Sequence, residues 1–305
     1  MLTQSTLGKL YLTGAFALAG TSVITGYLLS SALSGFTIMA VSMVVVLAGL
    51  LPFYAVRTIR TVRILSGHDW LMLLFQAVFG IFLFRIFLLF GVQSTSTAEA
   101  GILTGATPAI TSVMAYFILK ERFSGLTAVG IGGTVAGIVL LQGGSLVSVQ
   151  FSSRHFFGNV LILCAAASES TFNIISRKHG SRSSVSIHPM VQTLLVSAIT
   201  LCLSVIPALL EHPFAALSAL RRQEWLALLW YGFIITALAF AFFYSGARRC
   251  DAYTIAAFSG TMPLTSVLLS VLFLHESTTW VQWIGGALIL LGMTLIGQKN
   301  RRATC

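Results

Sequence analysis

Long apolar runs and short polar breaks alternate along the whole chain of 305 residues. Each run is about 18 to 25 residues long, which is enough for a helix to cross the roughly 30 Å hydrocarbon core of a bilayer. The pattern predicts an all-α polytopic membrane protein with ten transmembrane helices. The expected spans are residues 8–30, 36–56, 69–91, 97–119, 125–142, 157–177, 189–210, 225–247, 252–274 and 280–297.

The composition agrees with this pattern. Charged residues make up 9% of the chain and hydrophobic residues 56%, and the mean hydropathy is +0.92. An ordinary soluble domain carries about 25% charged residues. The composition therefore excludes a water-soluble globule.

The formal net charge of +10 invites a comparison with nucleic-acid-binding proteins. The positions of the charges argue against that class. With the N-terminus placed in the cytoplasm, fourteen Lys and Arg residues fall in inner loops and tails and three (Arg154, Arg221 and Arg222) in outer loops. This asymmetry follows the positive-inside rule. It predicts a multi-pass protein of the cytoplasmic (inner) membrane, with both termini in the cytoplasm and no nucleic-acid partner.

The chain contains an internal repeat at a shift of 155 residues. The matched pairs include Gly91 with Gly246, Gly105 with Gly260, Pro108 with Pro263, Glu121 with Glu276, Gly130 with Gly285 and Gly137 with Gly292. The first two helices of each half match more weakly, at a shift near 150. We expect two five-helix repeats, residues 1–145 and 146–305. Because five is odd, the two copies would cross the membrane in opposite directions, as in many secondary transporters.

The repeated stretches also resemble a known family. "GVQSTSTAEAGILTGATPAITSVMAYFILKER" and "WLALLWYGFIITALAFAFFYSGARRCDAYTIAAFSGTMPLTSVLLSVLFLHE", each followed by a glycine-punctuated helix, are similar to the two EamA domains of the drug/metabolite transporter superfamily. The resemblance covers essentially the whole chain. It implies ten helices in two inverted halves around a central cavity. It also implies transport of small organic solutes such as amino acids and related metabolites.

Gly105 with Pro108 and Gly260 with Pro263 mark matching positions in the fourth and ninth predicted helices. Small residues allow close approach of helices, and proline bends a helix by freeing a carbonyl. We expect paired hinges here, although packing alone is an equal alternative because glycine and proline are common in membrane helices. Each helix is followed by a glutamate, Glu121 or Glu276. These favour a structural or gating role over substrate contact.

Glu169 is predicted near the midplane of the sixth helix, where a charge costs at least about 2.5 to 3.5 kcal/mol. Asn173 and Ser176 follow at helical spacing, and Ser22 and Thr25 lie at comparable depth in the first helix. Two facing polar stripes predict a binding site. Glu169 would bind a cationic amine or carry a coupled proton. The alternative is a glutamate that only hydrogen-bonds to neighbouring helices.

Arg85 is predicted in the outer third of the third helix, at about the depth of Glu99 at the start of the fourth. One interpretation is a structural ion pair between the two. The other is that Arg85 binds a substrate carboxylate, for which the guanidinium geometry is suited. Direct pairing with Glu169 is not expected, because that residue lies roughly 11 Å deeper.

Aromatic residues are dense in the third and eighth predicted helices. Phe75 and Trp230 occupy matched positions, and we expect them to line the cavity and to favour a flat or cationic ligand. Packing in the membrane is the alternative for each of them. The cysteines and histidines lack the spacing of a metal site, and no nucleotide-binding motif is present. The sequence therefore predicts no metal, no cofactor and no enzymatic activity.

These observations predict a secondary transporter of small metabolites, amino acids or amines above all. It would work by alternating access as a monomer or homodimer. Efflux is favoured over uptake only through the family resemblance, and proton coupling through Glu169 is an open alternative to facilitated transport. A flippase for a lipid-linked small molecule and a receptor or scaffold without transport are the competing classes. A receptor would leave the midplane charge unexplained.

Overall fold

A computed structural model describes residues 4–120, 125–147, 153–182, 187–250, 252–274 and 279–297. These residues are almost entirely helical and include no strand. The first half contains α1 (Gln4–Ser30), α2 (Gly35–Ile64), α3 (Gly67–Ala77), the π-helical turn η1 (Val78–Leu83), α4 (Phe84–Val92), α5 (Thr97–Leu103), the 3₁₀ turn η2 (Thr104–Ala106), α6 (Thr107–Leu119) and α7 (Gly125–Val147).

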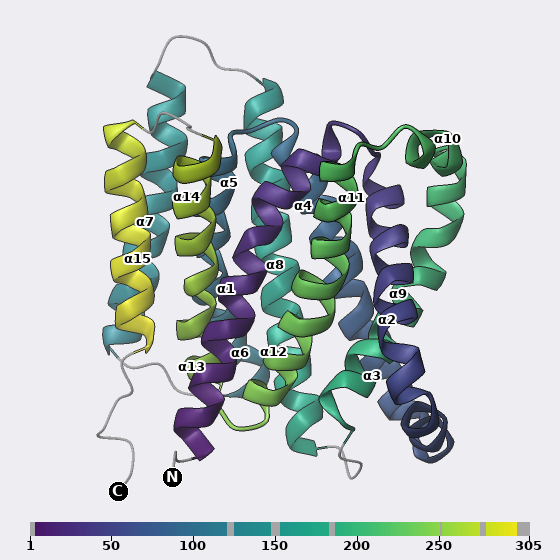
Figure 1. Ribbon diagram of the computed structural model, residues 1–305. Helices are drawn as coiled ribbons and strands as arrows, with labels where there is room; N and C mark the ends of the chain where they lie inside the picture. Colours follow the sequence, from purple (N-terminus) through teal and green to yellow (C-terminus); the bar gives the residue numbers. More distant parts are fainter. Residues whose placement is uncertain are drawn as a thin grey trace, which may run out of the picture.

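The second half repeats most of this order. It contains α8 (Ser153–Arg182), α9 (Pro189–Leu210), the short α10 (Pro213–Ser218), α11 (Arg222–Trp230), the π-helical turn η3 (Tyr231–Leu238), α12 (Ala239–Ala247), α13 (Ala252–Ser259), α14 (Thr261–Leu274) and α15 (Trp280–Gly297). The helices form one bundle. α1 begins and α15 ends at the same end of it (Figure 1).

Eight helical stretches in the described residues are long and apolar enough to cross a membrane. They coincide with eight of the ten predicted spans. The other two predicted spans, 125–142 and 280–297, fall on α7 and α15, where the apolar stretches are shorter, at Gly125–Gly137 and Trp283–Gly292. The chain is thus a helical, multi-pass membrane protein, and the full count of ten remains a prediction.

Polar side chains at helix ends fix several of the boundaries. Ser66 and Asp69 form a reciprocal cap at the start of α3, in which the Ser66 amide donates to Asp69 Oδ2 and the Asp69 amide donates to Ser66 Oγ. Ser96 accepts from the Glu99 amide at the start of α5. Such caps satisfy amide groups that a helix cannot satisfy itself. They therefore set where α3 and α5 begin.

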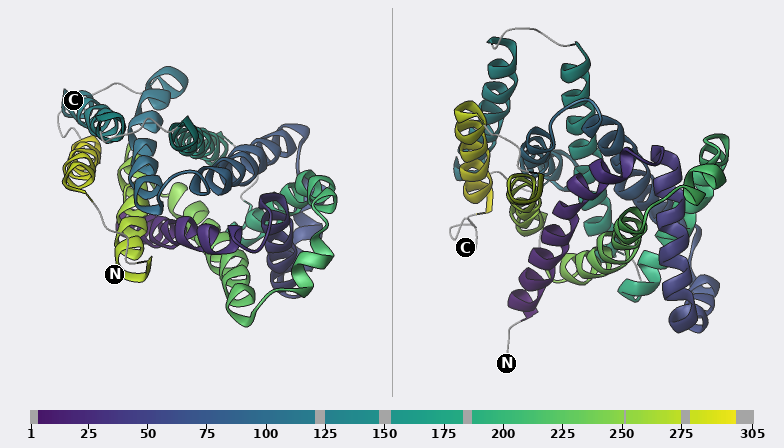
Figure 2. Two further views of the ribbon diagram at one scale, coloured as in Figure 1. Left: turned by 90° about the horizontal axis from the view of Figure 1, so that it is seen from above. Right: turned by 45° about the horizontal axis from the view of Figure 1, so that its top comes forward.

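Many helices pack against helices of the other half of the chain. α1 packs against α12 and α14 of the second half, and α8 packs against α4 and α6 of the first half. α2 pairs with α9 at one edge of the bundle, and α7 pairs with α15 at the opposite edge (Figure 2). Each contact between halves is thus matched by its reciprocal. α1 and α8 occupy the centre.

Glycines permit the closest of these contacts. A Cβ on Gly137 of α7 would lie 2.6 Å from the Gly285 carbonyl oxygen, and a Cβ on Gly292 of α15 would lie 2.4 Å from the Gly130 carbonyl oxygen. Neither distance is compatible with a real side chain. In the internal repeat, Gly137 corresponds to Gly292 and Gly130 to Gly285. In the structure, each of these glycines of α7 approaches the glycine of α15 that belongs to the other pair.

Candidate substrate cavity

A cavity lies among the central helices, between α1, α4, α8 and α12. The volume open to the centres of water molecules is about 50 Å³, which is room for a few waters. Four polar residues contribute to its wall, and all four are residues for which the sequence predicted a binding role: Ser22, Arg85, Glu169 and Asn173. The fold therefore brings together polar groups from α1, α4 and α8 at one site.

Arg85 is 2% exposed and is held by hydroxyl groups and an aromatic ring. Its Nη1 donates to Ser42 Oγ at 2.8 Å, and its Nη2 donates to Thr236 Oγ1. The guanidinium carbon lies 4.4 Å from the centre of the Tyr231 ring, within the range of a cation–π interaction. All these partners are uncharged. The positive charge of Arg85 is thus positioned precisely without being neutralised.

Two π-helical turns flank this arrangement. η1 ends directly before the turn that carries Arg85, and η3 contains both Tyr231 and Thr236. Thr236 Oγ1 donates to the Tyr231 carbonyl five residues earlier, at 2.7 Å, which is the spacing of a π turn. The wider turns redirect side chains that a regular helix would point elsewhere. The two turns, one from each half of the chain, thus position Arg85 and its hydrogen-bond partner Thr236.

Glu169 of α8 is buried and accepts a hydrogen bond of 3.1 Å from Thr107 Oγ1. The next residue, Ser170, donates to the Thr107 carbonyl at 3.1 Å. Thr107 begins α6 immediately after the 3₁₀ turn η2. The interruption in the helix therefore supplies the contacts to the buried carboxylate. No ion pair joins Glu169 to Arg85, as the difference in depth predicted.

Asn173 and Ser22 line the same cavity but have unmet hydrogen-bonding capacity. Both are 1% exposed. The amide nitrogen and oxygen of Asn173 and the hydroxyl of Ser22 make no hydrogen bond. Buried polar atoms are almost always paired, because leaving one unpaired costs about 1 to 3 kcal/mol. These atoms are therefore available for a ligand or water in the cavity.

The rest of the wall is apolar and aromatic. Phe172 lies at the centre of a group of rings, with ring centroids 4.8 Å from Phe243 and 5.4 Å from Phe240. Phe16 and Phe84 complete the aromatic part of the lining. Such a wall lowers the local dielectric and so strengthens electrostatic interactions inside the cavity. A ligand that fits here has charged or polar ends and an apolar body.

Three predicted site residues lie outside the lining. Phe75 is 37% exposed and Trp230 44% exposed, so both face outward, and the Trp230 indole donates to Thr21 Oγ1 at 3.0 Å. Thr25 is buried, and its hydroxyl donates to the Thr21 carbonyl of its own helix. Matched repeat positions did not identify the aromatic lining, because the face that points inward depends on packing between halves.

The ion pair considered between Arg85 and Glu99 is not formed. Glu99 instead contacts His155 at 2.7 Å and accepts from Asn159 and Thr95. The two charges lie in separate sites: Arg85 faces the cavity, and Glu99 lies at the start of α5. The interpretation of Arg85 as a cavity residue therefore remains.

The predicted hinges coincide with breaks in two helices. Gly105 lies in η2 and Pro108 follows at the start of α6, while Gly260 separates α13 from α14, with Pro263 just beyond. Proline lacks the amide that would continue the α-helical bonding. The hinge role itself stays a prediction. Glu121 and Glu276, expected in a structural or gating role, lie outside the described residues.

Sequence reasoning did not identify Ser42, Thr107 or Thr236. A single hydroxyl in an apolar run gives no periodic signal, and hydroxyls commonly bond to their own helix, as Ser42 Oγ also does to the Met39 carbonyl. The described residues contain no group of His, Cys, Asp and Glu that could hold a metal ion. The arrangement offers one basic and one acidic side chain at a small cavity inside the bundle.

The fold and the cavity together define a multi-pass helical membrane protein of the solute-transporter type. The model of the EamA-like transporter family matches residues 6–142 and again 156–298. The chain belongs to this family.

Similar proteins include other transporters. The "Uncharacterized transporter YetK" of Bacillus subtilis is 29% identical over 303 residues, covering 95% of this chain and 87% of that protein. The "Probable amino-acid metabolite efflux pump" of Salmonella typhimurium is 26% identical, covering 67% of this chain and 69% of its own. One solved crystal structure matches with a TM-score of 0.65 at 20% identity, covering 94% of this chain and 95% of that one. This last match shows likeness of fold alone.

Proposed function

We propose that this protein is a secondary transporter that moves small zwitterionic metabolites across the cytoplasmic membrane by alternating access. The observation that carries the proposal is the cavity itself. Arg85 and Glu169 face it without an oppositely charged partner, and Asn173 and Ser22 present unpaired polar atoms. Charges buried in a membrane protein are costly and mark solute or ion pathways.

The substrate class follows from the two charges. A carboxylate would be attracted to the guanidinium of Arg85, and an ammonium group to the carboxylate of Glu169. Amino acids and related metabolites carry both groups. The aromatic wall suits an apolar side chain between or beside them. The same reasoning makes a simple amine a weaker ligand, because it would leave Arg85 without a partner.

Alternating access is supported by the reciprocal packing of the halves. The exchanged contacts of α1 and α8, and of the glycines on α7 and α15, are those expected of two copies related by a two-fold axis. We therefore keep the two five-helix repeats, 1–145 and 146–305, and their inverted orientation as part of the proposal. In such transporters one repeat rocks against the other around a central site.

Efflux is the direction we propose, since a similar protein carries the name of an efflux pump. Glu169 is the group proposed to carry a coupled proton. It has a single neutral hydrogen-bond partner, so its protonation would remove a buried charge rather than break an ion pair. Proton release to one side and binding on the other would then drive transport.

A counterflow screen in proteoliposomes tests the proposal. Amino acids, simple amines, simple carboxylates and nucleosides are exchanged at two pH values. We expect exchange of amino acids. Arg85→Gln should lower it at least about tenfold while leaving simple amines less affected, because one charge-assisted hydrogen bond is worth that factor. Glu169→Gln should lower exchange and abolish its pH dependence.

One exposed residue and one residue at a helix start provide the controls. Arg154→Gln changes an exposed arginine, and Glu224→Gln changes a half-buried glutamate at the start of α11, where glutamine can still accept from the Arg221 amide. Both changes should leave exchange near wild type. Exchange of none of the solutes by a folded protein contradicts the proposal and favours a flippase. A pH dependence that survives Glu169→Gln contradicts the proton-carrying role alone.

A further inference from the structure

α8 carries a histidine near each end, and each histidine meets a carboxylate from the first half of the chain. His179 Nε2 lies 3.1 Å from Asp69 Oδ1 of α3. His155 Nε2 lies 2.7 Å from Glu99 Oε2 of α5. The histidines are 24 residues apart on one helix, or about 36 Å. This is longer than the hydrocarbon core, so the pairs lie toward opposite membrane surfaces.

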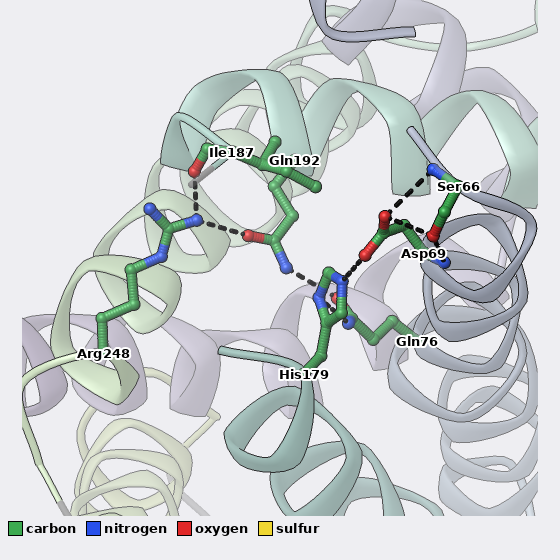
Figure 3. A network of polar contacts seen from close by, with 7 residues as sticks. All are labelled: Ser66, Asp69, Gln76, His179, Ile187, Gln192 and Arg248. Carbon is green, nitrogen blue, oxygen red and sulfur yellow. Dashed lines mark hydrogen bonds and ion pairs between the residues drawn. The ribbon is translucent and has the colours of Figure 1, made fainter. Parts of the chain in front are cut away.

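The Asp69 cluster is the more extensive of the two (Figure 3). Gln76 of α3 contacts His179 Nδ1 at 3.4 Å and accepts from Gln192 of α9 at 2.9 Å. Gln192 accepts in turn from Arg248 at the end of α12, which also donates to the Ile187 carbonyl. The chain of contacts thus joins α3 of the first half to three helices of the second half.

The Glu99 cluster occupies the other end of α8. Asn159, one turn beyond His155, donates to Glu99 Oε2 at 3.1 Å, and Thr95 lies in contact with both Glu99 and Asn159. Glu99 is 7% exposed as a whole residue. This cluster also joins the two halves, through α8 and α5. Glu169 lies between the clusters, ten residues from His179 and fourteen from His155.

We propose that these two clusters are the gates of the transporter, one on each side of the cavity. This inference rests on the proposed alternating-access function. Opening the cavity to one side requires the halves to separate at that end and to stay together at the other. Each cluster is a polar contact between the halves at one end only. A hydrogen-bonded polar contact is costly to separate where no water can replace it, yet water that enters the opening pathway can hydrogen-bond to both partners.

The state of the cavity agrees with this role. Both clusters are formed, and the cavity between them holds only about 50 Å³. Both proposed gates are thus in contact in this structure, on either side of a small cavity. The internal repeat does not account for the clusters. At the shift of 155, Asp69 corresponds to the half-buried Glu224 and Glu99 to Thr254, and at the shift near 150, His179 corresponds to Leu29. The histidine–carboxylate contacts therefore have no counterpart at the repeat-related positions.

Accessibility from each side tests the gates without a transport assay. A reporter cysteine replaces Ala19, which lines the cavity, in a protein whose native cysteines are replaced. A membrane-impermeant maleimide is applied to vesicles of either orientation. We expect His179→Ala to speed labelling from the Asp69 side, and His155→Ala from the Glu99 side, each by about tenfold or more. His68→Ala, an exposed histidine beside the first cluster, is the matched control and should change neither rate.

If a histidine variant folds poorly, a cross-linking experiment at the same contact tests the gate instead. The pair Asp69→Cys with His179→Cys, bridged by a bifunctional methanethiosulfonate that replaces the length of the two side chains, should close its side to the maleimide, and reduction of the bridge should reopen it. If the labelling rate is unchanged from both sides, or is raised equally from both, the two clusters are not gates. If the labelling behaves as expected but no solute exchanges, the gates stand and the proposed function fails. If solutes exchange but neither histidine variant changes the side from which the reporter is labelled, the transport function stands and the assignment of the gates is wrong.

Discussion

Hydroxyl and aromatic groups, rather than opposite charges, hold the buried charges of the cavity. Ser42 and Thr236 fix Arg85, and Thr107 contacts Glu169. A neutral hydrogen bond orients a charge yet leaves its field directed at the cavity. Each charge therefore gains most when a ligand of the opposite sign arrives. The same logic makes the unpaired Asn173 a cost in the empty protein.

Asn173→Leu should therefore stabilise the protein and disable it. Removing the unpaired amide recovers about 1 to 3 kcal/mol, and the leucine fills a similar volume. We expect a higher thermal unfolding temperature in detergent and a loss of exchange in proteoliposomes. Asn159→Leu on the same helix is the control, because Asn159 is bonded to Glu99. It should lower the unfolding temperature. A lower temperature for Asn173→Leu would mean that its amide has a partner.

His188 gives a second prediction at this scale, outside the membrane spans. It caps α9 by accepting from the Met190 amide. Partial burial and the charges of Arg57 and Arg248 lower the pKa of His188. The folded state then binds this proton less readily than the unfolded state, so stability is lost as pH falls through the unfolded pKa near 6.5.

We expect His188→Asn, which can still cap a helix, to unfold at a higher temperature than wild type at pH 5 and at the same temperature at pH 8. Arg57→Gln should reduce the difference between the two pH values in the protein that keeps His188. Equal pH profiles for wild type and His188→Asn would contradict this account.

The sequence predicted the polar stripe of the site because it obeys a helical period. Asn173 was found in this way from Glu169, and Ser22 was found because it lies at a comparable depth in the first helix. Glu169 and Arg85 were found because a lone charge stands out in an apolar run. The partners of Arg85 were not predictable by either signal. They come from α2 and η3, and their inward direction depends on a π turn and on packing between distant helices.

At the scale of elements, the apolar runs determine where helices lie, but not where they change geometry. Eight predicted spans coincide with membrane-length helices, while η1, η2 and η3 interrupt three of them at the cavity or beside it. The glycine and proline pairs marked the breaks near Pro108 and Pro263. Nothing comparable marked the two π turns, since they arise from the fit between helices.

Gly80 in η1 shows how tightly a π turn is packed. A Cβ at this position would lie 2.4 Å from Phe172 Cδ2, and Phe172 is surrounded by other rings of the cavity wall. Gly80→Ala should therefore push Phe172 into the cavity, lowering exchange and costing about 1 to 3 kcal/mol of stability. Gly35→Ala is the control, since its Cβ would meet Phe90 at an ordinary 3.6 Å. Unchanged exchange in Gly80→Ala would mean that Phe172 can move aside.

For the whole molecule, the glycines between α7 and α15 test how the halves are joined. Gly137→Ala and Gly292→Ala would each drive a methyl group into the backbone of the facing helix, whereas Gly132→Ala on α7 would meet nothing within 4 Å. We expect the first two to lower the unfolding temperature by similar amounts, and the third to leave it unchanged or slightly raised because alanine favours a helix. Unequal effects at Gly137 and Gly292 would argue against the reciprocal contact.

The exchange of α1 and α8 between the halves has a consequence for biosynthesis. α1 leaves the ribosome well before the helices that cover it, α12 and α14, which follow roughly 200 residues later. At about 5 to 20 residues per second, α1 waits for some 10 to 40 seconds with Ser22 unburied. During that interval the polar side chains of α1 need a temporary contact that keeps them away from the lipid chains. We expect the membrane insertion machinery, rather than lipid, to provide it.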